Sequence, residues 1–197
     1  MTEVICNGTS LKLVRLVIEL DEFPGYLTKG IGEDGRLERT EAKAREIAKR
    51  NFPQDDCREF VRAVCLWGDD PRRGGKVIKR NHPEKISKAM KSAFEFSMQG
   101  QIANALDAVT KLEGLAVSFG SKHLKFLAPD RHVVLDSIIS ERLGYTRDVK
   151  GYLQWLAACH EFVILVREAG VKYTGIGSDG WRVSDIEMAI FNKIRSE

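Results

Sequence analysis

The sequence is poor in the residues that would hold a small fold together by covalent or metal cross-links. Its 197 residues include only four cysteines, and Cys6, Cys57, Cys65 and Cys159 show neither paired nor metal-ligand spacing. This spacing favours neither a disulfide framework nor a zinc site, and it argues against a cysteine-bound iron–sulfur cluster. We therefore expect four reduced thiols, several of them in the core, and no metal site.

Long hydrophobic runs are also lacking. The most apolar early stretch, residues 11–20, is short and carries Lys12, Arg15 and Glu19, so it cannot span a bilayer. No secretory signal pattern opens the sequence, and we expect a cytoplasmic monomer without membrane contact. A composition of 43% hydrophobic and 30% charged residues is that of an ordinary globular protein with a real core.

Strand-like alternation is scarce, and the helical period dominates. Cys57, Phe60 and Val64 share one helical face, and the longest periodic run covers about residues 149–168. The last helix is expected to open with the capping box Ser184-Asp-Ile-Glu187. Residues 13–20 fit either a short strand or a helix. We predict an all-α fold in which any strand is confined to the first thirty residues.

Two glycine-rich loops match a dinucleotide-binding fingerprint. Residues 30–35 and 175–180 both read G-x-G-x-x-G. The fingerprint requires a strand before the loop, a helix directly after it and a second strand to complete a βαβ unit. Only one helix remains after Gly180, and the elements after Gly35 again read as helices. We interpret both loops as turns.

Positive charge is concentrated in one stretch, although the net charge is only +3. Eight basic residues and a single acid fall between positions 72 and 91. The segment 71–75, Pro-Arg-Arg-Gly-Gly, is expected to be a loop in which cations lie beside backbone that can approach a polyanion closely. Arg72, Arg73 and Lys76 are therefore candidate contacts to nucleic acid. The alternative is an ordinary solvated helix face.

The most informative segment surrounds Gly114. One helix is predicted to end near Lys111, and Gly114 supplies the unusual backbone conformation of a tight hairpin. A second helix is predicted to begin three or four residues later and to stop before Pro129. Free N–H groups at its start form an anion site suited to a DNA phosphate, which gives Gly114, Ala116 and Ser118 as candidate DNA contacts. Such a hairpin contacts the backbone of DNA and not its bases.

With this hairpin the chain resembles the helix-hairpin-helix DNA glycosylases, most of all the 8-oxoguanine glycosylase branch and its small bacterial members. The hairpin itself is Leu112-Glu-Gly-Leu-Ala116, and Val133-Val-Leu-Asp136 matches the hydrophobic run that delivers the family's aspartate. The fragments 63–68, 121–126 and 181–191 are also similar. The resemblance runs from about Ala63 to residue 197, and the first fifty residues are unmatched.

The resemblance implies a fold and a function. We expect one glycosylase-like domain, 1–197, of two helical lobes around a cleft, with residues 101–145 as the helix-hairpin-helix core. The implied activity is excision of an oxidised (8-oxoguanine-like) or otherwise modified base from duplex DNA by a lysine Schiff base, with a possible strand-cleaving lyase step and without a cofactor. The alternative is a helix-hairpin-helix protein that binds DNA without catalysis.

The resemblance also implies the catalytic pair, Lys122 and Asp136. A carboxylate stabilises the sugar cation at C1′, and a neutral lysine attacks that carbon. The sequence departs from the family pattern, because Ala116 replaces the second hairpin glycine and the usual lysine register falls on Ser118. Lys122 lies one helical turn further on the same face.

Alternatives to these assignments stay open. The sequence pattern alone is equally consistent with Lys122 as an exposed cation on a helix. It is also equally consistent with Asp136 as the N-cap of a helix over residues 137–143. Lys125 is the competing nucleophile, and His123 is a second neighbouring cation. A flipped base also needs an apolar slot, for which Trp67 and Trp181 are the candidates, although each is as readily explained as core packing.

Overall fold

The computed structural model describes residues 4–7, 10–13, 16–31, 34–176 and 180–197. Parts of both glycine-rich loops, residues 32–33 and 177–179, lie outside these ranges. All three described strands end before residue 20, and helices lie between them and both loops, so neither loop directly follows a strand. This agrees with their interpretation as turns.

A small antiparallel sheet precedes the helices. Its strands follow each other in the order β1-β2-β3, with Ser10 opposite Glu19 and Leu13 opposite Leu16. Leu16 and Ile18 are buried whereas Val17 is exposed, so β3 alternates as a half-buried strand does. The bounds are β1 Val4–Asn7, β2 Ser10–Leu13 and β3 Leu16–Glu19.

The rest of the described chain is helical, as the 3.6-residue spacing predicts. A short 3-10 turn, η1, occupies Leu20–Glu22. The helices are α1 Phe23–Ile31, α2 Arg36–Lys49, α3 Gln54–Trp67, α4 Pro71–Arg80, α5 Pro83–Met98, α6 Ile102–Thr110, α7 Val117–Leu127, α8 Ser137–Leu143, α9 Val149–Glu168 and α10 Val183–Ser196. None of the described helices is both long and apolar enough to cross a membrane.

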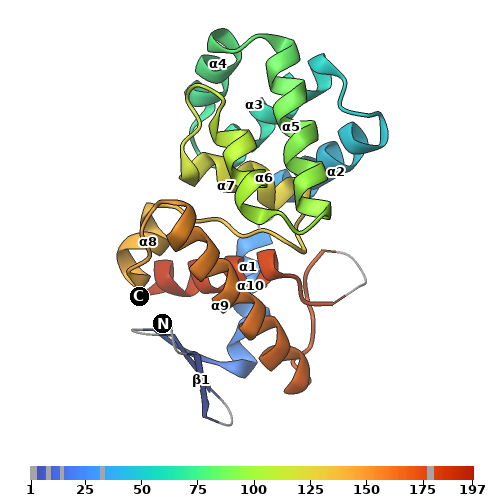
Figure 1. Ribbon diagram of the computed structural model, residues 1–197. Coiled ribbons are helices and arrows are strands. Elements are labelled where there is room, and N and C mark those ends of the chain that lie inside the picture. Colours follow the sequence, from blue (N-terminus) through green and yellow to red (C-terminus); the bar gives the residue numbers. More distant parts are fainter. Residues whose placement is uncertain (1–3, 8–9, 14–15, 32–33, 177–179) are drawn as a thin grey trace.

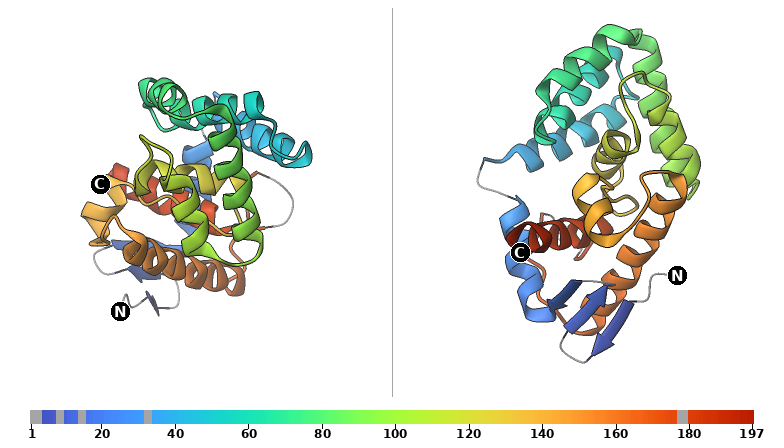
Figure 2. Two further views of the ribbon diagram at one scale, coloured as in Figure 1. Left: turned by 45° about the horizontal axis from the view of Figure 1, so that its top comes forward. Right: turned by 90° about the vertical axis from the view of Figure 1, so that its left-hand side faces the viewer.

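The helices form two groups that meet at α7. Figure 1 shows α2 to α7 together in the upper part and the sheet, α1, α8, α9 and α10 in the lower part. Helices α1 and α10 pack side by side although they come from opposite ends of the sequence (Figure 2). The chain therefore passes between the groups after α1 and again after α7.

Two local predictions are corrected by the helix starts. The segment 71–75 is the first turn of α4 and not a loop, because Pro71 occupies the first helical position and the Asp70 side chain accepts the N–H of Arg73 at 3.1 Å. Helix α10 begins one residue before Ser184, and its N-terminus is satisfied by Asp185, which accepts the N–H of Arg182 at 3.1 Å. Glu187 is consequently not a capping residue.

A buried ionic cluster ties the two groups of helices together. The Arg182 guanidinium donates to both carboxylate oxygens of Glu41 on α2, at 3.2 and 3.0 Å, and to Asp185 at 2.8 Å. Glu41 is 3% exposed and Asp185 1%. Because paired hydrogen bonds between a guanidinium and a carboxylate are directional, they fix the start of α10 against α2.

Three of the four cysteines are buried free thiols. Burial raises the pKa of Cys57 and of Cys65 to about 12, and it raises the pKa of Cys159 well above its ordinary value. The prediction of reduced, core-filling cysteines is confirmed for these three. The side chain of Cys6 lies outside the described part.

The core also contains a neutral histidine. His132 is fully buried between Ser97, 2.6 Å from Nε2, and the hydroxyl of Tyr152, 2.8 Å from Nδ1. Burial, with a smaller contribution from the charge of Arg131, lowers the pKa of His132 to about 3. The ring is thus held uncharged throughout the physiological range.

This histidine predicts acid sensitivity. Between pH 6.5 and about 3 the unfolded chain binds a proton at His132 that the folded chain does not, so stability is present above pH 6.5 and is lost as the pH falls. Lowering the pH from 7 to 5 should cost about 2 kcal/mol of unfolding free energy for this one group. Urea unfolding at the two pH values measures this loss. It should be smaller in His132→Gln than in the wild type, and unchanged in a variant of the exposed His82. An identical loss in His132→Gln contradicts the assignment.

Candidate active site

The turn between α6 and α7 has the predicted geometry. Helix α6 ends at Thr110 and α7 begins at Val117, while Gly114 adopts φ +97°, which strongly favours glycine. A β-carbon at Gly114 would also lie 3.1 Å from Cγ2 of Val77. The helix boundaries and the glycine turn predicted around Gly114 are therefore confirmed.

Helix α4 holds this turn in place. Arg73 donates from Nη1 to the carbonyl of Gly114 at 3.1 Å, and its guanidinium lies 4.3 Å from the ring centre of Phe119. Asn81 exchanges two hydrogen bonds of 3.0 Å with the backbone of Glu113. Arg73 was predicted as a DNA contact in a loop, but its guanidinium is engaged by the turn. Arg73 thus helps to fix the turn, but its side chain is still 37% exposed, and its contact with DNA remains a prediction.

The remaining hairpin candidates lie at the surface. Arg72 and Lys76 are exposed on α4, and Ala116 is exposed at the N-cap of α7. Ala116 has φ −93° and ψ −178° and makes no side-chain cap hydrogen bond, so this position does not require glycine. Ser118 is half-buried in the first turn of α7. The proposed contacts of these residues with DNA remain predictions.

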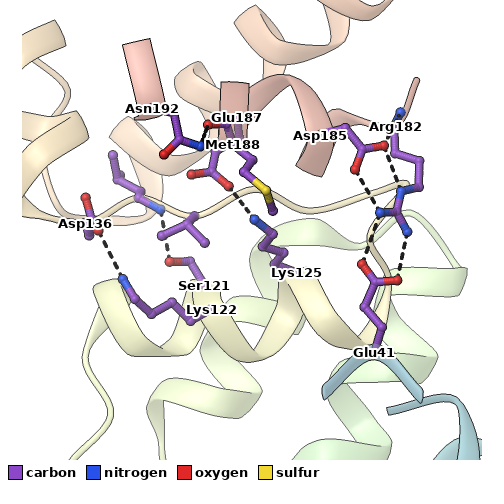
Figure 3. Close-up of polar contacts among 12 residues, drawn as sticks. Glu41, Ser121, Lys122, Lys125, Asp136, Arg182, Asp185, Glu187, Met188 and Asn192 are labelled. Carbon is purple, nitrogen blue, oxygen red and sulfur yellow. Dashed lines mark hydrogen bonds and ion pairs between the residues drawn. The ribbon is translucent and has the colours of Figure 1, made fainter. Parts of the chain in front are cut away.

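Lys122 and Asp136 meet. The Nζ atom of Lys122, from the middle of α7, donates to Oδ2 of Asp136 at 3.1 Å, and the two side chains are only 9% and 13% exposed (Figure 3). The other oxygen, Oδ1, accepts the backbone N–H groups of Ile138 and Ile139 at 3.1 and 3.2 Å. Asp136 thus caps α8 with one oxygen and holds the lysine with the other.

Ser121 fixes the distance between this lysine and this aspartate. Its hydroxyl donates to the carbonyl of Ser118 at 2.9 Å and accepts the N–H of Leu135 at 3.1 Å. The serine therefore joins α7 directly to the residue that precedes Asp136. Because Ser121 is fully buried, water does not compete for these bonds.

A second ion pair lies one helical turn further along α7. Lys125 donates to Oε2 of Glu187 on α10 at 3.1 Å, and the two side chains are 2% and 3% exposed. The ammonium group also lies 4.9 Å from the ring centre of Trp67. Burial raises the pKa of Glu187, whereas the charge of Lys125 opposes that rise. The pair is enclosed by protein from both groups of helices.

One cavity joins these two ion pairs. It has a volume of about 500 Å³ and is lined by residues of α1, the end of α3, α7, the segment 134–138 and α10. This size suits a small organic ligand. Lys122, Asp136, Lys125 and Glu187 all contribute to its wall. Among the described residues, no group of three or more His, Cys, Asp and Glu side chains is placed to hold a metal ion.

The two aromatic candidates for a base slot lie in different parts of the structure. Trp67 is half-buried and lines the cavity, where its ring meets Phe126 edge-on at 4.9 Å. Trp181 is 2% exposed, packs against Phe23 and donates from Nε1 to the carbonyl of Val171. Its interpretation as a pocket residue is wrong, because it belongs to the core of the lower group.

His123 does not supply a cation. Its ring is fully buried, its Nδ1 lies 2.6 Å from the carbonyl of Phe119, and it meets the ring of Phe60 edge-on. Burial lowers its pKa to about 4, so the ring is neutral at pH 7. The expected helper role of His123 beside Lys122 is therefore corrected.

The contribution of α10 to the cavity wall was not predicted from the sequence. Glu187, Met188, Phe191 and Asn192 all face the cavity from this helix. One signal was available, because Glu187 is an acid within a continuous buried run from Val183 to Ile190. A carboxylate in such a run requires a buried cation, and Lys125 is that cation.

The buried pair predicts an asymmetric response to mutation. Lys125→Met and Glu187→Leu should each lower the unfolding free energy by about 3–5 kcal/mol, because each leaves one buried charge alone. The double variant should recover most of that loss. Urea unfolding measures all three.

The exposed pair Lys111–Asp107 provides the control, since its side chains are 70% and 56% exposed and its removal should cost about 1 kcal/mol or less. Equal, additive losses for the Lys125 and Glu187 variants would contradict a buried pair.

Comparison with known proteins identifies a family for the chain. The model of one protein family, described as "Putative 8-oxoguanine DNA glycosylase OGG-like protein", matches residues 19–191. The match starts earlier than the similar fragments in the sequence, which begin at Ala63. No curated protein and no solved structure matches the chain. Because the family model covers most of the 197 residues, the chain belongs to this family of 8-oxoguanine DNA glycosylase OGG-like proteins.

Proposed function

We propose that this protein removes an oxidised or otherwise modified base from duplex DNA through a Schiff base formed by Lys122. One observation carries the proposal: Lys122 Nζ and the Asp136 carboxylate lie 3.1 Å apart on the wall of one open cavity. Neither an exposed helix cation nor a simple helix cap requires this convergence. The family of the chain supports base excision as the reaction class.

In the proposed reaction the two residues have separate roles. The Nζ lone pair of Lys122 bonds to C1′ while the bond from C1′ to the base breaks, and the base leaves with that electron pair and takes up a proton. Asp136 stabilises the positive charge that develops on the sugar. The nitrogen lone pair next forms the imine double bond while the bond from C1′ to the ring oxygen O4′ breaks and O4′ takes up a proton, which gives the Schiff base. Loss of the C2′ proton and departure of the 3′-phosphate with its bonding electron pair then cleave the strand. Lys122 must first lose its ammonium proton to solvent in the cavity, so that Asp136 stays ionised and able to stabilise the sugar cation.

Lys122 is the better nucleophile of the two lysines. Its pairing carboxylate belongs to a residue that remains 13% exposed at the cavity wall. Lys125 is held by Glu187, which is 3% exposed, and its ammonium group is covered by Trp67. Attack by Lys125 would require breaking a fully buried ion pair. We therefore assign Lys122 to catalysis and Lys125 to the structure of the cavity wall.

DNA is proposed to bind across the hairpin in the manner of a helix-hairpin-helix glycosylase, with residues 1–197 acting as one unit of two lobes around a cleft. The uncapped N-terminus of α7 presents free backbone N–H groups beside Gly114, Ala116 and Ser118, which suits a phosphate. Arg72 and Lys76 extend this surface along α4. We propose that the protein acts as a cytoplasmic monomer.

The extruded base is proposed to enter between α3 and α10. Trp67 and Phe191 line the cavity from these two helices and offer aromatic surface for stacking. Glu187 and Asn192 supply polar atoms on the same wall. A purine-sized base fits the cavity volume of about 500 Å³.

Covalent trapping tests the proposed nucleophile. Borohydride reduces an imine between a lysine and C1′, so the wild-type protein should become linked to duplex DNA that carries an abasic or oxidised-base site. Lys122→Gln should abolish the linked species, read by denaturing electrophoresis, while DNA affinity stays nearly unchanged. Trapping by Lys122→Gln and not by Lys125→Gln, assayed where both variants are folded, would assign the nucleophile to Lys125. Absence of trapping by the wild type on every substrate favours a protein that only binds DNA.

Asp136 is tested through the difference between rate and stability. Asp136→Asn should slow base release by about 100-fold or more if the carboxylate stabilises the sugar cation. The same change should keep the cap of α8, because asparagine caps helices nearly as well as aspartate, so any loss of unfolding free energy should come from the lost charge pairing with Lys122. Single-turnover kinetics and urea unfolding measure the two effects. An unchanged rate leaves Asp136 with only its capping role.

The cations of α4 are tested through salt dependence. Each phosphate contact contributes about −0.9 to the slope of log affinity against log salt concentration. The double variant Arg72→Gln, Lys76→Gln should therefore flatten the slope by up to about two, measured by fluorescence anisotropy. Arg73 is left intact because it holds the hairpin. Lys172, beyond the end of α9, is the control. An unchanged slope would show that this face of α4 is exposed to solvent and does not contact DNA.

A further inference from the structure

Gly68 occupies a position where the backbone does not need glycine. It follows the last residue of α3 and adopts φ −80° and ψ 16°, a conformation open to any L-residue. Its N–H donates to the carbonyl of Val64 at 2.9 Å and so completes the last turn of the helix. Another cause must therefore explain a glycine at this position.

The cause is the side chain of Lys122. A β-carbon at Gly68 would lie 3.0 Å from Cδ and 3.1 Å from Cε of Lys122, and 3.1 Å from Cε1 of Phe119. These separations are shorter than ordinary carbon–carbon contact distances of about 3.5–4.0 Å. The lysine stem thus runs directly across the face of Gly68, in the space that a side chain at this position would fill.

Three groups border the Lys122 side chain between its α-carbon and Nζ. Gly68 borders the middle of the stem, the ring centre of Phe119 lies 5.4 Å from Nζ, and Asp136 receives Nζ at 3.1 Å. Phe119 is itself covered by the guanidinium of Arg73. The stem is therefore bounded along its length before its nitrogen reaches the cavity.

We propose that Gly68 is a positioning residue for Lys122: its missing side chain creates the channel that carries Nζ to Asp136. The contact itself is independent of the reaction, whereas its consequence for catalysis rests on the proposed function. Gly68 also lines the cavity. A direct contact of a larger side chain with the extruded base is therefore the competing effect, but it leaves the stability of the DNA-free protein unchanged.

The mechanics of the contact decide which partner moves. The end of α3 is held by backbone hydrogen bonds, including one of 2.9 Å from the N–H of Asp70 to the carbonyl of Cys65. The lysine stem has four rotatable bonds and a single polar anchor at Asp136. A methyl group at Gly68 is consequently accommodated by Lys122, and its nitrogen is displaced from Asp136. The contacts of 3.0–3.1 Å require a shift of a few tenths of an ångström. Because a displacement of about 1 Å lowers the rate of a positioned reaction by up to about 100-fold, the smaller shift should lower it by up to about 10-fold.

Gly68→Ala tests the proposal in a single-turnover trapping assay on duplex DNA with one abasic site. We expect the rate of imine formation to fall by about 3- to 10-fold, with a nearly unchanged dissociation constant for that DNA and a melting temperature close to wild type. Gly25→Ala is the matched control, because a β-carbon at Gly25, on the exposed side of α1, meets nothing within 4 Å. A wild-type rate in Gly68→Ala overturns the proposal.

A second measurement does not depend on catalysis. Gly68→Val should lower the melting temperature in the wild-type background, and by a clearly smaller amount in Lys122→Ala, where the stem has been removed. An equal loss in both backgrounds shows that Gly68 does not contact Lys122 and overturns the proposal. If the wild type fails to trap DNA, the proposed function fails, and the paired melting temperatures still decide whether Gly68 determines the path of Lys122.

Discussion

A charge inside a protein needs a partner of opposite sign, and this requirement determines how the last helix is placed. Lys125 on α7 and Glu187 on α10 are each almost fully buried, so neither is tolerated without the other. The two hydrogen bonds from the Arg182 guanidinium to the Glu41 carboxylate fix the start of the same helix against α2. Because α10 is held at these two places, its register is set, and with it the cavity wall that it forms. The arrangement of the site thus follows from pairing buried charges across two groups of helices.

Asp136 shows that a structural role and a functional role can be served by one carboxylate. Its Oδ1 satisfies two backbone N–H groups at the start of α8, and its Oδ2 faces Lys122. The cap orients the carboxylate without using the oxygen that the proposed reaction requires. Ser121 adds a second restraint by holding Leu135 against α7. Together these bonds preorganise the aspartate, and preorganisation is the main source of electrostatic stabilisation in enzymes.

The parts of this structure that were predicted from the sequence depend on local signals. The extent of α9 and the turn at Gly114 each rest on spacing within a short segment, whereas the candidate pair Lys122 and Asp136 was implied by the resemblance to a known family. The segment 71–75 was misread because Pro and Gly-Gly are typical of loops, whereas Pro71 is accommodated at the first position of α4. Trp181 was misassigned because an aromatic residue carries no local sign of which wall it joins. The contacts of Lys125 with Glu187 and of Gly68 with Lys122 join distant segments, so no local pattern reveals them.

The pairing of Lys125 with Glu187 also bears on how the protein is made. Sixty-two residues separate the two partners along the chain. While α7 has been synthesised and α10 has not, the ammonium group of Lys125 has no carboxylate to meet, and burying it alone is costly. The final position of α7 is therefore stabilised only once α10 has been synthesised and has paired with it. A ribosome-bound chain that stops short of α10 carries the catalytic candidates without the wall that α7 and α10 share.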